Sequence, residues 1–334
     1  MKFTRFLRSM LFILLFMSTV HLHAQPKIIF DTDLGGDADD LGALAMLHHY
    51  VDWGECDLLA VMCWSGEQYA IPAIDAVNRY YGHPDIPLGV RKEGTFKTDW
   101  HYTRPLAQYF PHLHSFWDVP DATQLYRKIL AGQPDNSVVI VTVGPLKNIQ
   151  NLIQSQPDGH SDLHGIDLIS KKVKQFVIMG GKFPEGEDEW NFDGDMRGVT
   201  RFVVDHISVP VVFSGYEIGV QIKTGKKFNE LDTGHPLYVG YKHFSEHAPW
   251  MKEYYKGEIL DNASYDQTAV LYAVKGRVGE FWEEVKGGYC EVEPDGDNHW
   301  VEGEETNESY LKLTAPPEEV AKEIEAVMLG KKWE

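Results

Sequence analysis

The sequence predicts an α/β protein built on an open, mostly parallel β-sheet with helices on both faces. Two observations predict this fold class. Short, fully apolar segments rich in β-branched residues alternate with segments of helical periodicity, and each apolar segment runs into a loop that contains glycine or polar residues. The 334 residues, 43% of them hydrophobic, are enough to bury a substantial core and argue against a disordered or fibrous chain.

The expected strands and helices follow one another along the chain. The apolar runs predicted as strands are 27–31, 58–64, 138–143, 176–179 and 209–213. The segments predicted as helices are one that begins at Asp39, and then 71–81, 122–131, 146–153 and 199–206. Because ligands of open α/β sheets bind outside the carboxyl ends of the strands, the loops after these strands are the predicted functional region.

Two further segments interrupt or follow this alternation. Residues 91–120 are a long connection rich in aromatic residues and histidine, which we interpret as packing or as the rim of a pocket. Residues 287–313 predict β-hairpins, and residues 317–328 predict a final amphipathic helix. With no obvious linker, we expect one domain over 25–334 that ends in a C-terminal appendage of hairpins and helix, about 287–334.

The first 24 residues have the order of a secretory signal peptide. Lys2, Arg5 and Arg8 precede an apolar run at 10–20, and the small residue Ala24 precedes Gln25. The apolar run is about half of the roughly 20 residues that span a bilayer. We therefore expect cleavage after residue 24 and export to the periplasm or the outside of the cell; the alternative is an uncleaved N-terminal anchor.

The chain is strongly acidic. Lys and Arg number 31 and Asp and Glu 50, which gives a formal net charge of −19. Removal of the signal leaves 28 basic residues against 50 acidic ones, a net charge of −22. Such an excess repels phosphate backbones and anionic lipids, so we expect neither nucleic acid nor a membrane surface as partner. The natural complement of an acidic chain is a cation.

The three cysteines do not predict a metal site. Cys56, Cys63 and Cys290 are an odd number and form no Cys-x-x-Cys pair. Cys56 and Cys63 flank and occupy an apparent buried strand, so we interpret them as small apolar core residues, with a disulfide as the alternative.

The acid is densest directly after the first strand. Residues 31–40 hold five carboxylates, which would repel one another strongly unless some of them bind a proton or a cation. A hard cation with oxygen ligands, Ca²⁺ or Mg²⁺, resolves this repulsion. The alternative is an N-cap of the following helix by Asp39 or Asp40, but a cap accounts for only one of the five.

This loop and three later segments resemble the nucleoside hydrolases that prefer inosine and uridine. The four matching segments occur in the family's order and together cover roughly residues 27–275. They are Asp31-Thr-Asp33-Leu-Gly with Asp39-Asp40, then Val143-Gly-Pro-Leu-Lys-Asn148, then Met179-Gly-Gly with Glu189-Trp-Asn191, and finally Tyr265-Asp266-Gln-Thr-Ala269. The resemblance implies a Ca²⁺-dependent N-ribohydrolase on an α/β fold.

The resemblance also implies a role for each matching position. The Ca²⁺ ligands would be Asp33, Asp40, the backbone carbonyl of Val143, and Asp266. The residues that bind the ribose would be Asp39, Glu189 and Asn191. Asp33 is the expected general base that activates water. Flanking carboxylates would stabilise the positive charge that builds up on the ribose as the N-glycosidic bond breaks. As alternatives, Glu189 and Asn191 are ordinary loop residues and Asp266 is a helix cap.

Two departures from the family pattern leave assignments open. The family's first loop is two residues shorter, so Asp37 is a further candidate metal ligand in place of Asp39 or Asp40. The family's leaving-group histidine aligns with Tyr265. We expect Tyr265 to bind substrate, either as a proton donor, although a phenol is a weaker acid than imidazolium, or as a stacking partner of the base.

The predicted function is hydrolysis of the N-glycosidic bond of a ribonucleoside or related riboside, with Ca²⁺ as cofactor and a small-molecule riboside as partner; a homo-oligomer stays open. Two other classes stay open. One is a Ca²⁺-dependent sugar-binding protein without turnover, and the other is a Mg²⁺-dependent phosphohydrolase with an Asp nucleophile, which needs a lysine near the acids. Assembly into a homo-oligomer, the identity of the base and the physiological substrate are not predicted by these patterns.

Overall fold

The computed structural model describes residues 25–94, 100–194, 196–303 and 306–333. The predicted signal peptide, residues 1–24, lies outside the described residues. Within the described part of the chain, no helix is long and apolar enough to cross a membrane.

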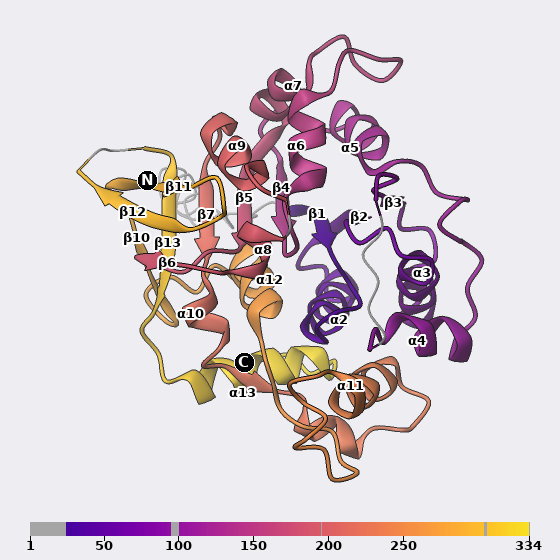
Figure 1. Cartoon of the computed structure of the whole chain (residues 1–334). Helices are drawn as coiled ribbons and strands as arrows, with labels where there is room; N and C mark the ends of the chain where they lie inside the picture. The colour runs from indigo at the N-terminus through magenta and orange to yellow at the C-terminus, as the bar shows by residue number, and fades with distance from the viewer. Residues whose placement is uncertain (1–24, 95–99, 195, 304–305, 334) are drawn as a thin grey trace, which may run out of the picture.

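The centre of the molecule is an eight-stranded sheet (Figure 1). All neighbouring strands are parallel except β10, which pairs antiparallel with β13 at one edge. In spatial order the strands are β10 (Trp282–Val285), β13 (Glu308–Leu313), β7 (Val211–Ser214), β5 (Val173–Met179), β4 (Val138–Thr142), β1 (Lys27–Thr32), β2 (Asp57–Cys63) and β3 (Leu88–Val90). The strand order reverses at β1, between β4 and β2, which is where open α/β sheets bind ligands.

Helices cover both faces of this sheet (Figure 1). Successive residues of the central strands belong to different hydrophobic clusters, as the period of two in a strand requires. Phe30 of β1 packs with the helices on one side, and its neighbour Ile29 packs with those on the other. The first side holds α2 (Asp39–Asp52), α3 (Ala70–Tyr80), α4 (Thr103–Tyr109), α11 (Pro236–His247), α12 (Tyr265–Lys275) and α13 (Pro317–Met328). The second side holds α5 (Ala122–Ala131), α6 (Lys147–Gln154), α7 (Gly165–Lys172) and α9 (Val199–His206).

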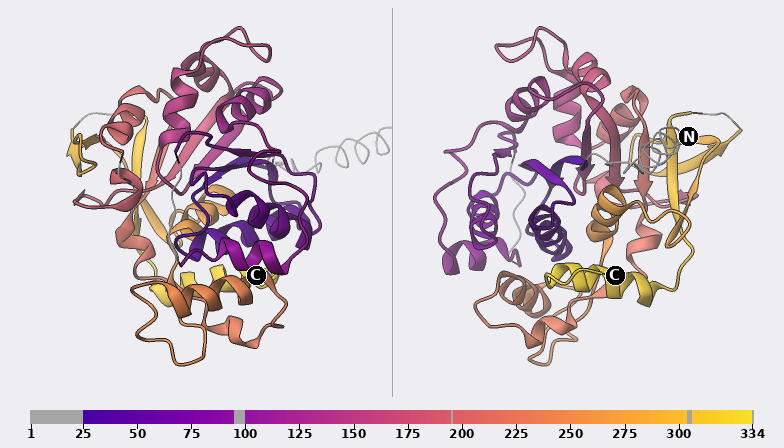
Figure 2. Two further views of the ribbon diagram at one scale, coloured as in Figure 1. Left: turned by 45° about the vertical axis from the view of Figure 1, so that its right-hand side comes forward. Right: turned by 180° about the vertical axis from the view of Figure 1, so that it is seen from behind.

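Smaller elements lie around the central sheet and its two helix layers (Figure 2). A three-stranded sheet is formed by β11 (Gly288–Val292), β12 (Asn298–Glu302) and β6 (Glu185–Gly186). A two-stranded sheet joins β8 (Lys223–Thr224) to β9 (Asn262–Ala263). The remaining short helices are α8 (Trp190–Asp193), α10 (Tyr216–Gly219) and the 3₁₀ helix η2 (Lys226–Glu230).

The predicted α/β fold with its mostly parallel sheet is confirmed, and each expected strand and helix is present with shifts of a few residues at its ends. The C-terminal strands and the final helix are also present. β11 and β12 form a hairpin, whereas β13 enters the central sheet beside β7, and α13 packs on α2. The three cysteines, Cys56, Cys63 and Cys290, are buried and form no disulfide, as expected for core residues.

Candidate active site

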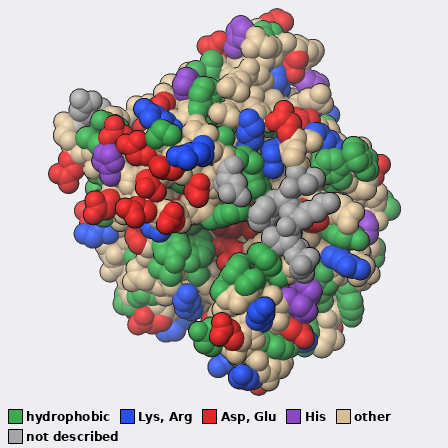
Figure 3. Space-filling view, in the orientation of Figure 1, with side chains coloured by type: hydrophobic (Ala, Val, Ile, Leu, Met, Phe, Trp, Pro, Cys, Tyr) green, Lys and Arg blue, Asp and Glu red, His purple; other side chains and the backbone are tan. Residues whose placement is uncertain are grey.

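A cavity of about 670 Å³ opens at the carboxyl ends of β1, β4, β5 and β7. Its floor is acidic and its walls are aromatic. In the space-filling view, acidic side chains lie at the bottom of a central hollow and hydrophobic side chains flank it (Figure 3). Seven carboxylates line it: Asp33, Asp37, Asp39, Asp40, Asp188, Glu189 and Asp266. Five aromatic residues line it: Trp100, Trp190, Tyr216, Trp250 and Tyr265.

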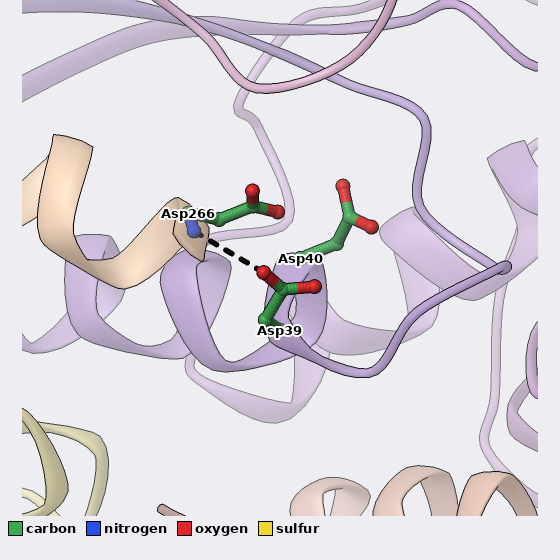
Figure 4. Close-up of side chains that lie close together, drawn as sticks. All are labelled: Asp39, Asp40 and Asp266. Atoms are coloured by element: carbon green, nitrogen blue, oxygen red, sulfur yellow. Dashed lines mark hydrogen bonds between the residues drawn. The ribbon is translucent and has the colours of Figure 1, made fainter. Parts of the chain in front are cut away.

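Three of the carboxylates form a buried group that we call the carboxylate trio: Asp39, Asp40 and Asp266 (Figure 4). One oxygen from each lies within 4.8 Å of the others. They come from the first turns of α2 and α12, which pack against each other on one face of the sheet. Segments more than 200 residues apart in the chain therefore build one site.

The trio is only partly satisfied by hydrogen bonds. Asp39 Oδ2 accepts from the backbone N–H groups of Tyr265 and Asp266, both at 3.2 Å. Asp40 Oδ1 accepts from the hydroxyl of Thr32. Asp266 Oδ2 is buried and has no hydrogen-bond partner among the described residues. A buried, unpartnered carboxylate oxygen costs free energy, so this position requires a proton or a cation.

Burial raises the pKa of all three carboxyls well above their ordinary value, and the neighbouring aspartates raise it further. None of the described residues that line the cavity is Lys, Arg or His. The described lining therefore supplies no positively charged partner for these carboxylates. A donor set of carboxylate oxygens is what hard divalent cations prefer, so the residues present fit a metal ion.

Asp33 lies in the same cavity but outside the trio. Its Oδ2 accepts from the indole N–H of Trp190 at 3.2 Å, and burial raises its pKa to about 6. Gly144, after β4, lets Asp33 approach, because a Cβ there would lie 2.9 Å from Asp33 Oδ1. Asp37 accepts from the backbone N–H of Ala38 at 2.6 Å and from the amide of Asn262.

The expected sugar-binding residues lie on the opposite wall, beside α8. Glu189 is buried and accepts from the backbone N–H groups of Gly181 (2.8 Å) and Phe192 (3.1 Å), while burial raises its pKa to about 7. Asn191 donates to the carbonyl oxygen of Val143 at 2.9 Å and to that of Met179 at 3.1 Å. The side chain of Asn191 thus contacts the Val143 carbonyl, which the family resemblance implies as a metal ligand.

Tyr265 stacks on Tyr216, with ring centroids 5.2 Å apart and planes 23° from parallel. Burial, followed by the nearby Tyr216, raises the pKa of Tyr265 above its ordinary value. A phenol with a raised pKa is a poor proton donor, so this geometry favours a stacking role over an acid role.

Every residue predicted for the site therefore lines one cavity, but several of its residues were not predicted. Asp31, which does not itself line the cavity, is buried near the end of β1, where it accepts from Tyr126 (2.8 Å) and Asn148 (2.9 Å), and burial raises its pKa to about 7. Asn148 belongs to the segment 143–148 that resembles the family, so this motif was the sequence signal for its contact with Asp31. Nothing local in the sequence indicated that Trp100 and Trp250 meet, with ring centroids 5.8 Å apart.

Comparison with solved structures finds the same architecture in distant relatives. The inosine-uridine preferring nucleoside hydrolase from Bacillus anthracis is 12% identical, with a TM-score of 0.63 over 91% of this chain and 98% of that chain. The type III effector protein XopQ, solved in complex with adenosine diphosphate ribose, is 15% identical, with a TM-score of 0.65 over 92% of this chain and 94% of that chain. At these identities, the similarity shows the shared fold.

A search of curated proteins finds no match. The model of the family described as inosine-uridine preferring nucleoside hydrolase matches residues 28–324, which include every segment that lines the cavity. The chain therefore belongs to the inosine-uridine preferring nucleoside hydrolase family.

Proposed function

We propose that this protein hydrolyses the N-glycosidic bond of a riboside in a Ca²⁺-dependent reaction, releasing ribose and the free base. The observation that carries the proposal is the cavity itself. It joins a carboxylate trio with an unpartnered buried oxygen to a separate carboxylate, Asp33, and to aromatic walls. Family membership supports the class of reaction, and the geometry supports where it would occur.

The residues that would hold Ca²⁺ are Asp33, Asp40, Asp266 and the carbonyl oxygen of Val143, all of which line the cavity. Asp39 belongs to the carboxylate trio as well, and we propose that it also accepts a hydrogen bond from a ribose hydroxyl. Asp37 is the remaining candidate ligand. When bound, the metal would orient a sugar diol and a water molecule and lower the pKa of that water.

Asp33 is the proposed general base. It lies in the cavity outside the carboxylate trio, where it can contact both a metal ion and a water molecule, and a general base must be ionised and still accept a proton. The hydrogen bond that the indole N–H of Trp190 donates to Asp33 orients the Asp33 carboxylate. Once it is ionised, Asp33 would take a proton from water as the water oxygen bonds to the anomeric carbon.

Glu189 and Asn191 are proposed to face the sugar from the opposite wall. Breaking the bond to the base builds up positive charge on the ribose ring, and a carboxylate beside the ring stabilises that charge. Two backbone N–H groups donate hydrogen bonds to the Glu189 carboxylate and fix its position, so it need not reorganise during the reaction.

The direct test is to incubate the protein with purine and pyrimidine nucleosides, with Ca²⁺ or with a chelator, and to measure the reducing sugar released. The Asp33→Ala variant should lose about 100-fold or more in kcat, because a general base contributes about 10²–10⁴-fold. Asp205→Ala, an exposed acid on α9 outside the cavity, is the matched control and should keep full activity.

Equal sugar release by the Asp33→Ala and parent proteins would contradict the catalytic proposal. Calcium binding with no turnover of any riboside would instead support a sugar-binding protein. The phosphohydrolase alternative has less support, because it requires a cationic side chain near the acids and none lines the described part of the cavity. Because XopQ was solved with adenosine diphosphate ribose, that ribosyl compound belongs among the substrates tested.

We further propose that residues 1–24 are an export signal and that residues 25–334 form a single domain. The order of cations, apolar run and small residue supports the first proposal. The entry of β13 into the central sheet and the packing of α13 on α2 support the second. Mass spectrometry of the protein recovered from its native host should give a chain that begins at Gln25; an intact Met1 would contradict cleavage.

A further inference from the structure

The cavity combines two features that recognise positive charge. Seven carboxylates lie at its floor and rim, and no cationic side chain is among the described residues that line it. A divalent metal ion would offset only two of the seven negative charges of the ionised site. Such a cavity repels a phosphorylated ligand and attracts a cation.

The walls provide the second feature. Trp250 contacts Trp100 edge to face, with ring planes 79° apart. Tyr216 of α10 and Tyr265 of α12 stack nearly parallel. The exposed fractions of Trp250 (47%) and Tyr216 (37%) show that both rings present open surface rather than filling the core. Indole and phenol faces attract cations, and they do so most strongly where the cation is also shielded from water.

The same lining suits a leaving group that needs no proton. When a neutral purine or pyrimidine leaves a ribose, its nitrogen takes up an electron pair and must be protonated or otherwise stabilised. The described lining has no imidazole, ammonium or guanidinium, so the proton would have to come from Tyr265, a poor donor, or from a carboxyl that the metal ion or the ribose needs in its ionised form. A leaving group that already carries a positive charge at the nitrogen bonded to the sugar needs no such donor.

We propose that the preferred substrate is a riboside whose aromatic base carries a fixed positive charge at the glycosidic nitrogen, such as an N-ribosylpyridinium. The C1′–N bond breaks heterolytically, and its electron pair passes to the ring nitrogen, which becomes neutral. Water supplies the new oxygen at C1′, and one of its protons passes to a carboxylate and then to solvent. The step needs no oxidant or reductant. The proposal rests on the proposed riboside hydrolysis and specifies its substrate class.

Binding tests the proposal without turnover. In calorimetric titrations at saturating Ca²⁺, the N-methylnicotinamide cation should bind about tenfold more tightly than neutral nicotinamide, which has the same ring and amide. Trp250→Leu should reduce this ratio several-fold. Trp117→Leu, which removes a tryptophan that is 84% exposed and lies outside the cavity, should leave the ratio unchanged.

Activity gives the second measurement. Nicotinamide riboside should be hydrolysed with a kcat/KM at least about tenfold above those of inosine and uridine. Equal or tighter binding of neutral nicotinamide, together with faster hydrolysis of neutral nucleosides, would overturn this inference and leave the proposed function intact. Tighter binding of the cation with no riboside hydrolysed would support the cationic site and overturn the proposed function. Binding of neither probe, with no hydrolysis, would overturn both.

Discussion

At the scale of single residues, the most informative atom is Asp266 Oδ2, which is buried and without a hydrogen-bond partner in the described structure. Asp266 sits on the first turn of α12, so helix capping was a simpler interpretation. However, its Oδ2 has no N–H partner, and its backbone N–H bonds to Asp39 instead. The side chain is therefore oriented toward its fellow carboxylates rather than toward its own helix.

The Asp266→Asn variant should have two opposite effects. Loss of this carboxylate should weaken Ca²⁺ binding by about 100-fold or more, because loss of an outer partner of a metal ligand alone costs about 10–100-fold. The same change removes a buried negative charge, so the metal-free variant should melt at a higher temperature than the metal-free parent. Calcium calorimetry and thermal unfolding measure the two effects. Unchanged affinity would remove Asp266 from the metal site.

Short local motifs were sufficient to predict much of the cavity lining. The lining residues that belong to such motifs are Asp33, Asp39, Asp40, Glu189, Asn191, Tyr265 and Asp266. The patterns could not predict the contact from Trp190 to Asp33, because it joins residues 157 positions apart through a side-chain direction that only the fold determines. The family resemblance placed Asp39 among the sugar-binding residues, whereas the structure groups it with Asp40 and Asp266.

At the scale of elements, the site depends on glycines that let neighbouring segments approach. Gly144, in the loop after β4, borders Asp33, and a Cβ there would lie 2.9 Å from the Asp33 side chain. The Gly144→Ala variant should therefore displace Asp33 and lower kcat/KM by about 100-fold, the usual cost of a misplaced catalytic group. Gly159→Ala, where an added Cβ meets nothing within 4 Å, is the matched control. Equal activity of the two variants would contradict this account of the loop.

The contact between α2 and α12 that assembles the carboxylate trio also depends on a glycine. A Cβ at Gly42 would lie 2.5 Å from Gln267 Nε2 and 2.7 Å from Met328 Sδ. Although alanine favours helix more than glycine does, Gly42→Ala should lower the free energy of unfolding by about 1–3 kcal/mol through overpacking. Gly132→Ala, where the nearest atom is 3.6 Å away, should not. Denaturant unfolding measures both, and a stabilised Gly42→Ala variant would contradict the packing.

The alternation of apolar strands and helices was sufficient to predict the buried parallel strands, since strands covered on both faces are apolar throughout. It was not sufficient for β3 and β10, which lie at the two edges of the sheet and are short. The helix α4 lies inside the aromatic segment 91–120, whose periodicity does not distinguish it from a loop. The pairing of β13 with β7 depends on long-range contacts that a local hairpin pattern does not contain.

At the scale of the whole molecule, the acidic site makes stability depend on both pH and calcium. Burial first, and then neighbouring charge, raises the pKa values of Asp39, Asp40 and Asp266 in the metal-free fold. The folded state therefore holds protons that the unfolded chain has lost, and stability falls as the pH rises toward the raised values. Bound Ca²⁺ favours the ionised carboxyls and so opposes this loss.

We predict that the melting temperature of the metal-free protein falls as the pH rises above about 6.5, and that the stabilisation by a fixed Ca²⁺ concentration grows in the same direction. Buried histidines do not reverse this trend. His48, whose pKa burial lowers to about 3, contributes a stability that increases with pH only up to its unfolded pKa near 6.5. Differential scanning calorimetry with and without chelator measures the effect. A calcium stabilisation that shrinks as the pH rises would contradict it.

The central claim is that one calcium site in this cavity enables riboside hydrolysis. Its most direct test is a titration of the chelator-treated protein with Ca²⁺, in which calcium binding and release of free base from a riboside are measured on the same samples. The account predicts one functional site per chain and base release that rises in proportion to its occupancy. Full activity in the chelated protein, or full occupancy without release of base from any riboside, would contradict it.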